Sequence, residues 1–436
     1  MPKNNRKSKA NQASNNNNNN NFKYENDSDD EYSNDGASVY SYQSDNAAIP
    51  DVEEASDNVV EKYEEKLMQA IENASEKSQQ TRTQALQVMN EIFMHHSMFD
   101  FVDERRVTIL DIIEKSLKRG KGQEQAHAAR MSALLLIQLQ GDEDVVKSLA
   151  PLLQQTALDT SASSDARAKC CLSLALLHFL GGDDVGDLII LCQMFEGIFS
   201  GSYLKGDNTP STANADAGGL HAAALGAWAL ALTLIPPGDV VSLIQTKQIL
   251  ASFKNLMGLL QSQHLDVRMT AGEAIALLLE SGRAHDEEFL DEYITDLIEM
   301  TKLLATDSQK FRAKRDRKQQ RATFRDVLHY IEEEISPEIA IQVGNGLTKE
   351  QLTLDTWAVH HQYSCICNAL GSGMNIHLLD NEFLRDVFQM GIRLDPDQIT
   401  TKKLSKNEKR AIQAASFKAR TISRGKNRDK RSAVVN

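Results

Sequence analysis

Residues 265–281 read LDVRMTAGEAIALLLES, and this stretch decides the fold class of the chain. It begins with an Asp-x-Arg step and continues with apolar residues at helical spacing, a pattern typical of an amphipathic helix. An acidic residue in the first turn also suits the positive end of the helix dipole. Similar openings occur at Arg82, Arg130 and Arg167. We therefore interpret each of the four as the start of the first helix of a repeated pair.

Amphipathic segments of helical period fill the body of the chain, with short polar or Gly-containing breaks between them. Their approximate ranges are 81–95, 99–118, 123–139, 142–157, 164–180, 184–199, 217–235, 239–261, 265–281 and 286–305. Such short connections place successive helices antiparallel, as helical hairpins. A two-helix unit of roughly 37–54 residues is typical of HEAT and armadillo repeats. The sequence thus predicts an all-α, HEAT/armadillo-like helical-repeat solenoid.

Four parts are expected along the chain. Residues 1–57 form an Asn-rich and then acidic segment that cannot bury enough apolar surface to order itself, so a disordered tail is predicted. Residues 58–305 hold the repeats. Residues 306–398 form the C-terminal helical part of the repeat body, with helices expected over about 310–335, 352–370 and 381–390. Residues 399–436 form a basic C-terminal helix and tail.

Composition limits the cellular setting. The five cysteines are odd in number and fall mostly within apolar helical patterns, which favours a reducing compartment, cytosol or nucleus. The longest nearly unbroken apolar run, Ala222–Ile235, is too short to span a bilayer and indicates a buried helix. The polar, Asn-rich start shows no signal peptide. We expect neither a membrane partner nor a small-molecule substrate.

Charge is strongly segregated. The formal net charge is −13, yet the run 402–431 carries twelve Lys/Arg against two acids. This basic tail is the predicted nucleic-acid-binding site. Its cations are Lys402, Lys403, Lys406, Lys409, Arg410, Lys418, Arg420, Arg424, Lys426, Arg428, Lys430 and Arg431. Because the rest of the chain is acidic and repels a polyanion, such contact must be local.

The basic tail allows three interpretations. Residues 426–431 match a nuclear import signal, and basic clusters often serve this purpose. The tail could instead contact a phosphate backbone, or have no function. Ser405-x-x-Glu408 is a capping box that predicts a helix, which argues against the last interpretation. With Phe417 as the one aromatic residue, the tail would read shape and charge with strong salt dependence.

A second basic run, residues 310–325, holds eight Lys/Arg and one acid. It is either a solvated helix face paired with acids of neighbouring repeats or a second contact for a polyanion or protein. The residues of this possible second basic contact are Lys314, Arg315, Arg317, Lys318 and Arg321.

No catalytic residues, cofactor or metal site are predicted. The chain has no P-loop, G-x-S-x-G or H-E-x-x-H motif. His360-His361 and Cys365-x-Cys367 could suggest zinc. However, residues at i and i+2 of a helix point about 200° apart, so both thiols could not reach one ion. Core packing is the favoured interpretation for these residues.

Three blocks in the last third of the chain resemble the interferon-related developmental regulator family. The blocks are 314–328 (KRDRKQQRATFRDVL), 370–388 (LGSGMN, then HL and NEFLRDVF) and the tail segments 414–421 and 428–431. The resemblance implies an α-helical repeat regulator of gene expression without catalysis. Members are associated with binding inactive ribosomes and with deacetylase-containing co-repressors. The poly-Asn start and the loop 200–219 depart from the family pattern. They lie outside the three matching blocks, so they bear only on which partners the resemblance implies for the N-terminal region.

Two hypotheses for function follow. In the first, the basic C-terminal helix docks on ribosomal RNA and the protein restrains translation. In the second, the protein is a nuclear transcriptional co-regulator whose solenoid binds transcription factors and deacetylase co-repressors, with the tail as import signal. The two roles could coexist in one protein, so we expect cytoplasmic and nuclear localisation, and neither role requires an enzyme.

Overall fold

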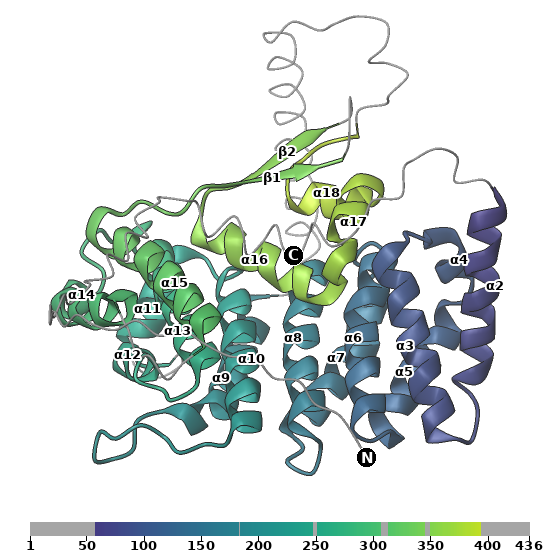
Figure 1. The fold of residues 1–436 in the computed structure, drawn as a ribbon, viewed down its shortest axis with the longest axis horizontal. Helices are drawn as coiled ribbons and strands as arrows, with labels where there is room; N and C mark the ends of the chain where they lie inside the picture. Colours follow the sequence, from purple (N-terminus) through teal and green to yellow (C-terminus); the bar gives the residue numbers. More distant parts are fainter. Residues whose placement is uncertain (1–56, 183, 247–250, 307–312, 345–348, 394–436) are drawn as a thin grey trace, which may run out of the picture. The chain divides into compact units, whose positions relative to one another are not determined.

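The computed structural model describes residues 57–182, 184–246, 251–306, 313–344 and 349–393 (Figure 1). Helices dominate this part of the chain, so the predicted all-α class is confirmed. The predicted disordered tail lies outside the described residues except for Asp57, and the predicted basic C-terminal helix lies wholly outside them.

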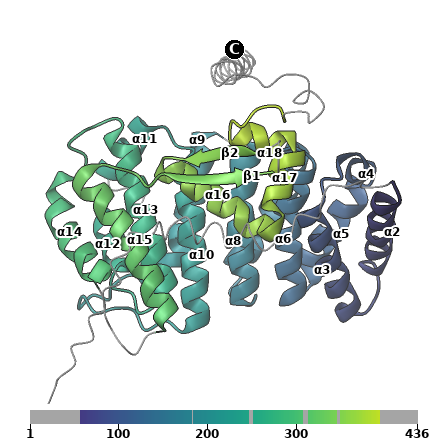
Figure 2. The same cartoon turned by 45° about the horizontal axis from the view of Figure 1, so that its top comes forward.

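The repeat helices form two packed rows. The front row comprises α3 (Gln79–His95), α6 (Gln123–Gln138), α8 (Ser164–Gly181), α10 (Ala215–Leu232), α13 (Leu265–Arg283) and α15 (Lys314–Glu333). The back row comprises α2 (Asp57–Asn73), α5 (Arg106–Arg119), α7 (Glu143–Leu158), α9 (Val185–Phe199), α11 (Pro237–Gln245), α12 (Phe253–Leu259) and α14 (Asp291–Thr306). Consecutive front-row helices contact each other, and each back-row helix packs on a front-row helix (Figure 2). This is the two-layer packing of a helical-repeat solenoid.

Local signals in the sequence explain where many helices begin. A small polar residue precedes the first turn, and its side chain accepts a hydrogen bond from a backbone amide of that turn. The residues that cap helices of the two rows in this way are Ser78, Asp142, Ser163, Asp184, Asn214 and Ser252. The caps satisfy amides that a helix cannot pair internally.

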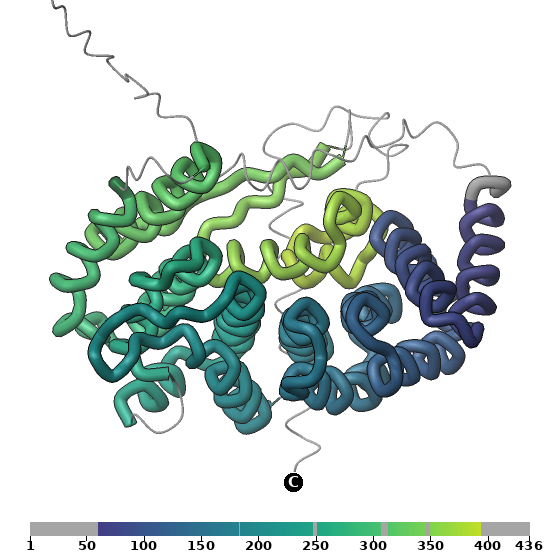
Figure 3. The backbone as a smooth tube through the Cα atoms, turned by 60° about the horizontal axis from the view of Figure 1, so that its bottom comes forward, coloured from purple at the N-terminus to yellow at the C-terminus, as the bar shows by residue number. Residues whose placement is uncertain are grey.

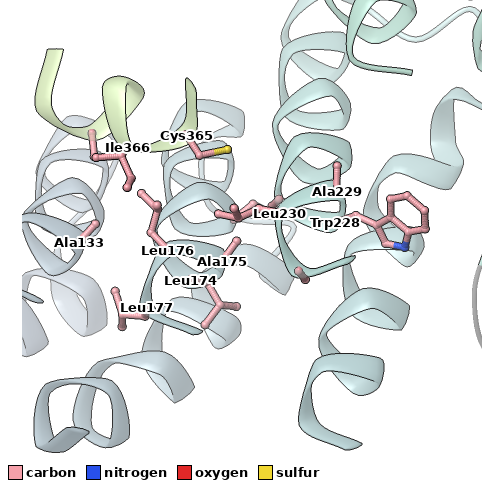
Figure 4. Packing of buried hydrophobic residues seen from close by; sticks show 14 of the residues in the cluster. Ala133, Leu174, Ala175, Leu176, Leu177, Trp228, Ala229, Leu230, Cys365 and Ile366 are labelled. Atoms are coloured by element: carbon pink, nitrogen blue, oxygen red, sulfur yellow. The ribbon is translucent and has the colours of Figure 1, made fainter. Parts of the chain in front are cut away.

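The core lies between the rows and is richest around α8 and α10. Leu230 of α10 points towards Ala175 and Leu176 of α8, whereas Trp228 points away from α8, and all of these side chains are buried (Figure 4). The apolar run Ala222–Ile235 falls largely in α10, so its interpretation as a buried helix is confirmed.

Three details of the repeat prediction are wrong. Arg82, Arg167 and Arg268 each occupy the fourth position of a front-row helix, but Arg130 lies a full turn later in α6. The segment 99–118 is two helices, α4 (Phe99–Glu104) and α5, which meet at Arg105. The segment 239–261 is also two helices, since α11 ends at Gln245 and Ser252 caps α12.

A β-hairpin follows α15, in a segment where the sequence predicted no element between the helices 310–335 and 352–370. Strand β1 (Ile339–Val343) pairs antiparallel with β2 (Glu350–Leu354), with Ile339 opposite Leu354. The predicted start of a helix at Leu352 is therefore wrong. Alternation of buried and exposed residues along both strands is the period-2 signal of a half-buried sheet.

Within the described residues, one segment, Val185–Ser202, is long and apolar enough to cross a membrane by length and composition alone. It comprises α9 and the short 3-10 helix η1 (Ser200–Ser202). Cys192, Phe195 and Phe199 of this segment are buried, and α9 packs on α10. These contacts are those of a core helix.

The chain then returns across the solenoid. Helix α16 (Trp357–Leu370) is followed by a 3-10 turn η3 (Gly371–Gly373), α17 (Met374–Asp380) and α18 (Glu382–Val387). We call residues 357–393 the C-terminal block. Helix α16 contacts α3, α6, α8, α10 and α13, and so crosses the side of the front row that faces away from the back row (Figure 3).

Candidate functional site

The two ends of α16 are held by charged side chains of the front row. At its N-terminus, the Glu280 carboxylate accepts hydrogen bonds from the backbone amides of Trp357 (2.9 Å) and Ala358 (3.0 Å). At its C-terminus, Arg130 donates from Nε (2.9 Å) and Nη2 (2.7 Å) to the carbonyl oxygen of Ala369. An anion at the N-terminus and a cation at the C-terminus both complement the helix dipole.

The middle of α16 joins the front row through polar and apolar contacts. His361 donates from Nε2 to the Gly226 carbonyl of α10 (2.7 Å), and Gln362 donates to the Thr233 hydroxyl (3.0 Å). Cys365 and Ile366 face the apolar side chains of α8 and α10 (Figure 4). The front-row side of the solenoid is therefore occupied along α16 by the protein's own chain.

The histidines and cysteines of α16 are engaged in packing. His360 donates from Nε2 to the Pro337 carbonyl (2.7 Å), and His361 Nε2 lies 3.5 Å from Cys365 Sγ. Burial raises the pKa of the Cys367 thiol to about 12 and raises that of Cys365 as well. Among the described residues, no group of three or more His, Cys, Asp or Glu side chains could hold a metal ion.

The motif Gly371-Ser372-Gly373 docks the C-terminal block on the end of α3. Gly371 ends α16 with a positive φ of 56°, a conformation that favours glycine. A Cβ at Gly373 would lie 1.6 Å from the backbone oxygen of Met94, so the two segments approach as only glycine allows. The Ser372 hydroxyl and His95 Nε2 form a hydrogen bond of 2.9 Å. The motif thus ends α16 and also docks the C-terminal block on α3.

Helices α17 and α18 continue this docking. His377 donates from Nε2 to the Phe93 carbonyl (2.9 Å), and burial lowers its pKa to about 4. Asn381 caps α18 through its side-chain oxygen and donates from Nδ2 to the Ile137 carbonyl (3.1 Å). Arg385 is buried and forms an ion pair of 2.7 Å with Glu350 of β2. The block therefore fastens α3, α6 and the hairpin together.

The five described cations of the predicted second basic contact all lie on α15. Lys314, Arg315 and Lys318 are exposed, and Arg317 and Arg321 are half-buried. Among the described residues, Lys314, Arg315, Arg317 and Arg321 take part in no ion pair. The structure places these residues on one helix, as predicted, but tests no contact with a partner.

The twelve cations of the basic tail, residues 402–431, lie outside the described residues. The last described residue is Arg393, which donates to Asp380 at the end of α17 (2.7 Å). The chain thus leaves the described region from the docked C-terminal block.

Several residues important for this arrangement were not singled out as sites from the sequence. Glu280 carries no motif signal, because it lies within an ordinary helical pattern, whereas His377 and Arg385 lie in the block 370–388 but were assigned no role there. Arg130 was assigned to a repeat opening, whereas its guanidinium binds α16. A charged residue at a helix position that should face the core was the available signal for Arg385.

Comparison with known proteins agrees with the described motifs. The family model for interferon-related developmental regulator matches residues 36–332, and the model for interferon-related protein conserved region matches residues 381–432. Interferon-related developmental regulator 2 of Mus musculus is 40% identical over 380 residues, which cover 86% of this chain and 84% of the relative. Interferon-related developmental regulator 1 of Homo sapiens is 38% identical over 379 residues, covering 86% and 82%.

The two family models include the block 314–328, residues 381–388 of the second block, and the tail segments 414–421 and 428–431. The family is named for developmental regulation and not for a reaction. The chain belongs to the interferon-related developmental regulator family.

Proposed function

We propose that this protein is a non-enzymatic regulator of gene expression that binds ribosomal RNA through its basic C-terminal tail and thereby restrains translation. The observation that carries the proposal is the extent of the second family match. Residues 381–432 join the docked helix α18 to the basic run 402–431 in one conserved region. A basic segment that follows a docked helix is anchored to the folded body at its start. Its Lys and Arg side chains can attract and bind the phosphates of a polyanion.

The acidic body supports a local contact of this kind. The formal net charge of the whole chain is −13, although the tail and the run 310–325 are both basic. The remainder of the chain is therefore strongly negative. The remainder disfavours non-specific adsorption to nucleic acid, because like charges repel. Binding should therefore depend on the basic segments and weaken steeply as salt rises.

The test is co-sedimentation of the full-length protein with ribosomes. In the tail variant, Arg424, Lys426, Arg428 and Lys430 are replaced by Glu. We expect at least a tenfold loss of binding, together with loss of translational restraint in a cell-free reaction. The control variant replaces Lys66, Lys115, Lys118 and Lys147, which are exposed on the body, by Glu and makes the same change in net charge. Binding undiminished in the tail variant would refute the proposal.

The transcriptional hypothesis proposes deacetylase co-repressors and transcription factors as partners. It receives less support, because α16 already covers the front-row side that a solenoid commonly offers to partners. The two hypotheses share the proposed cytoplasmic and nuclear localisation. Deleting residues 399–436 separates them: loss of nuclear entry in a protein that never associates with ribosomes would favour the transcriptional role.

A further inference from the structure

A row of cations lies along one side of α15. Lys314, Lys318, Arg321 and Arg325 follow each other at steps of four, three and four residues, the spacing that places side chains on one helix face. Lys314, Lys318 and Arg325 are exposed and Arg321 is half-buried. We call these four residues the α15 strip. It spans about 16 Å along the helix axis, with roughly one positive charge per turn.

The two halves of α15 differ in how their charges are paired. In the C-terminal half, Glu332 pairs with Lys302 of α14 (2.7 Å) and Glu334, which caps the helix, pairs with Arg283 of α13 (2.8 Å). In the N-terminal half, Lys314 and Arg321 have no ion-pair partner among the described residues, and neither has Arg325 just beyond that half. Neighbouring helices therefore neutralise the acidic half and leave most of the strip's charge unpaired.

The placement of the strip does not serve the stability of α15. Cations near a helix N-terminus oppose the helix dipole. Each like-charged pair at i, i+3 or i, i+4 also destabilises the helix, and the strip contains three such pairs in succession. Beside the strip, Nε of Arg317 is buried with no hydrogen-bond partner among the described residues. The electrostatic energy of this row of cations is therefore unfavourable unless an anion binds beside it.

The rest of α15 fixes the strip in place. Phe324, Val327, Tyr330 and Ile331 are buried, and Gln320 accepts two hydrogen bonds from the buried Arg268 of α13 (2.7 and 3.2 Å). As the last helix of the front row, α15 packs on α13 and α14. The strip is therefore a rigid row of charge on an end helix of the solenoid.

From these observations we infer that the α15 strip binds the phosphate backbone of double-helical RNA. This inference rests on the proposed function and adds a second contact to that of the tail. A strand of a DNA duplex presents a phosphate about every 3.4 Å along its axis. The spacing in an RNA duplex is of the same order, so on the order of five phosphates fall within the length of the strip. The strip residues include no aromatic side chain for stacking on bases, which favours backbone contact without sequence readout.

The test is binding of the full-length protein to a short RNA duplex of scrambled sequence, followed by fluorescence anisotropy between about 50 and 200 mM salt. The strip variant carries Lys314→Gln, Lys318→Gln, Arg321→Gln and Arg325→Gln. Its control carries Gln at Lys66, Lys115, Lys118 and Lys147, which removes the same charge. We expect the strip variant to bind at least tenfold more weakly and its slope of log K against log salt to fall by about 3–4. The control should keep the wild-type slope.

The outcomes separate this inference from the proposed function. A wild-type slope in the strip variant, with binding lost in the tail variant, would overturn the strip and leave the tail proposal standing. Ribosome binding that is lost in the strip variant and intact in the tail variant would overturn the tail proposal and leave the inference about the strip standing. A wild-type protein that binds a polyglutamate peptide but not the duplex would overturn the inference in favour of an acidic protein partner. Folding is checked by circular dichroism, where the strip variant should melt no lower than the wild type because repulsion is removed.

Discussion

Glu280 of α13 and Arg130 of α6 bind opposite ends of the same helix, α16. Each residue comes from a different repeat, and each satisfies backbone groups that a helix terminus leaves unpaired. The carboxylate of Glu280 also accepts the Ser336 hydroxyl (2.9 Å), so it links α16 to the segment before the hairpin. Glu280 and Arg130 thus fix the two ends of α16 on the front row.

Replacing Glu280 should loosen the C-terminal block. Glu280→Ala leaves two amides and one hydroxyl without their acceptor, and we expect a loss of roughly 3 kcal/mol in the free energy of opening α16. Hydrogen exchange of the amides in residues 357–370 measures this opening. The exposed Glu299→Ala on α14 serves as control and should change exchange little. Equal protection of α16 in both variants would contradict the role of Glu280.

The close approach at Gly373 predicts a large difference between two glycine substitutions. Gly373→Ala places a methyl group against the Met94 backbone oxygen, which cannot move aside without displacing the end of α3. We expect a loss of several kcal/mol, on the scale of severe core substitutions. Gly219→Ala is the matched control, because a Cβ there meets nothing within 4 Å and Gly219 lies in α10. It should stabilise the protein by up to about 1 kcal/mol, as measured by thermal unfolding.

The Arg82–Glu124 pair tests the contact between α3 and α6. Arg82 binds the carboxylate through two hydrogen bonds of 2.6 and 3.0 Å, and the Glu124 side chain is only 2% exposed. Arg82→Met leaves that buried carboxylate without its cation and should cost roughly 3 kcal/mol. The double variant with Glu124→Leu should recover most of the loss, because no charge remains buried. If the double variant is as unstable as the single one in urea titration, the pair has a different role.

A pair of acids on α13 and α15 predicts a pH dependence. Burial, together with the nearby Asp326 carboxylate, raises the pKa of Glu273 to about 7. Burial also raises the pKa of Asp326 to about 6, against the opposing effect of His329 and Arg325. Both carboxyls are thus favoured as protonated groups in the folded state. The fold gains stability as pH falls from about 8 towards 5 and loses it as pH rises through these values.

Glu273→Gln removes one of these groups while keeping its size. The variant should have a higher urea midpoint than the wild type at about pH 8, and the difference should vanish near the ordinary glutamate pKa of 4.5. Asp296→Gln, an exposed acid on α14, is the control. A stability difference for Glu273→Gln that does not change with pH would show that burial does not perturb this carboxyl.

The helices of the repeats could be predicted from the sequence because their signals are local. Apolar spacing fixes which residues of α8 and α13 are buried, and capping residues such as Ser163 fix where helices begin. The hairpin was missed although its signals were present. Ile339–Val343 alternates in polarity and is followed by Gly344, which adopts a positive φ.

The docking of α16 could not be predicted in the same way. Arg130 and the Ala369 carbonyl that it binds are 239 residues apart, and an apolar stripe states only that a face is covered, not by which segment. For the basic residues, periodicity places Lys314, Lys318 and Arg321 on one side of a helix. It cannot show that Glu332 and Glu334 form ion pairs with Lys302 and Arg283, since these two cations come from other helices.

Helix α16 also sets a limit on how this protein can vary. An ordinary solenoid gains or loses a repeat easily, because each unit contacts only its neighbours and unfolds almost independently. Here one helix touches five front-row helices, from α3 to α13. Inserting or deleting a repeat between Arg130 and Glu280 would move these two residues out of reach of the ends of α16. The number of repeats between them is therefore fixed by the length of one helix, and the array should unfold as a single cooperative unit.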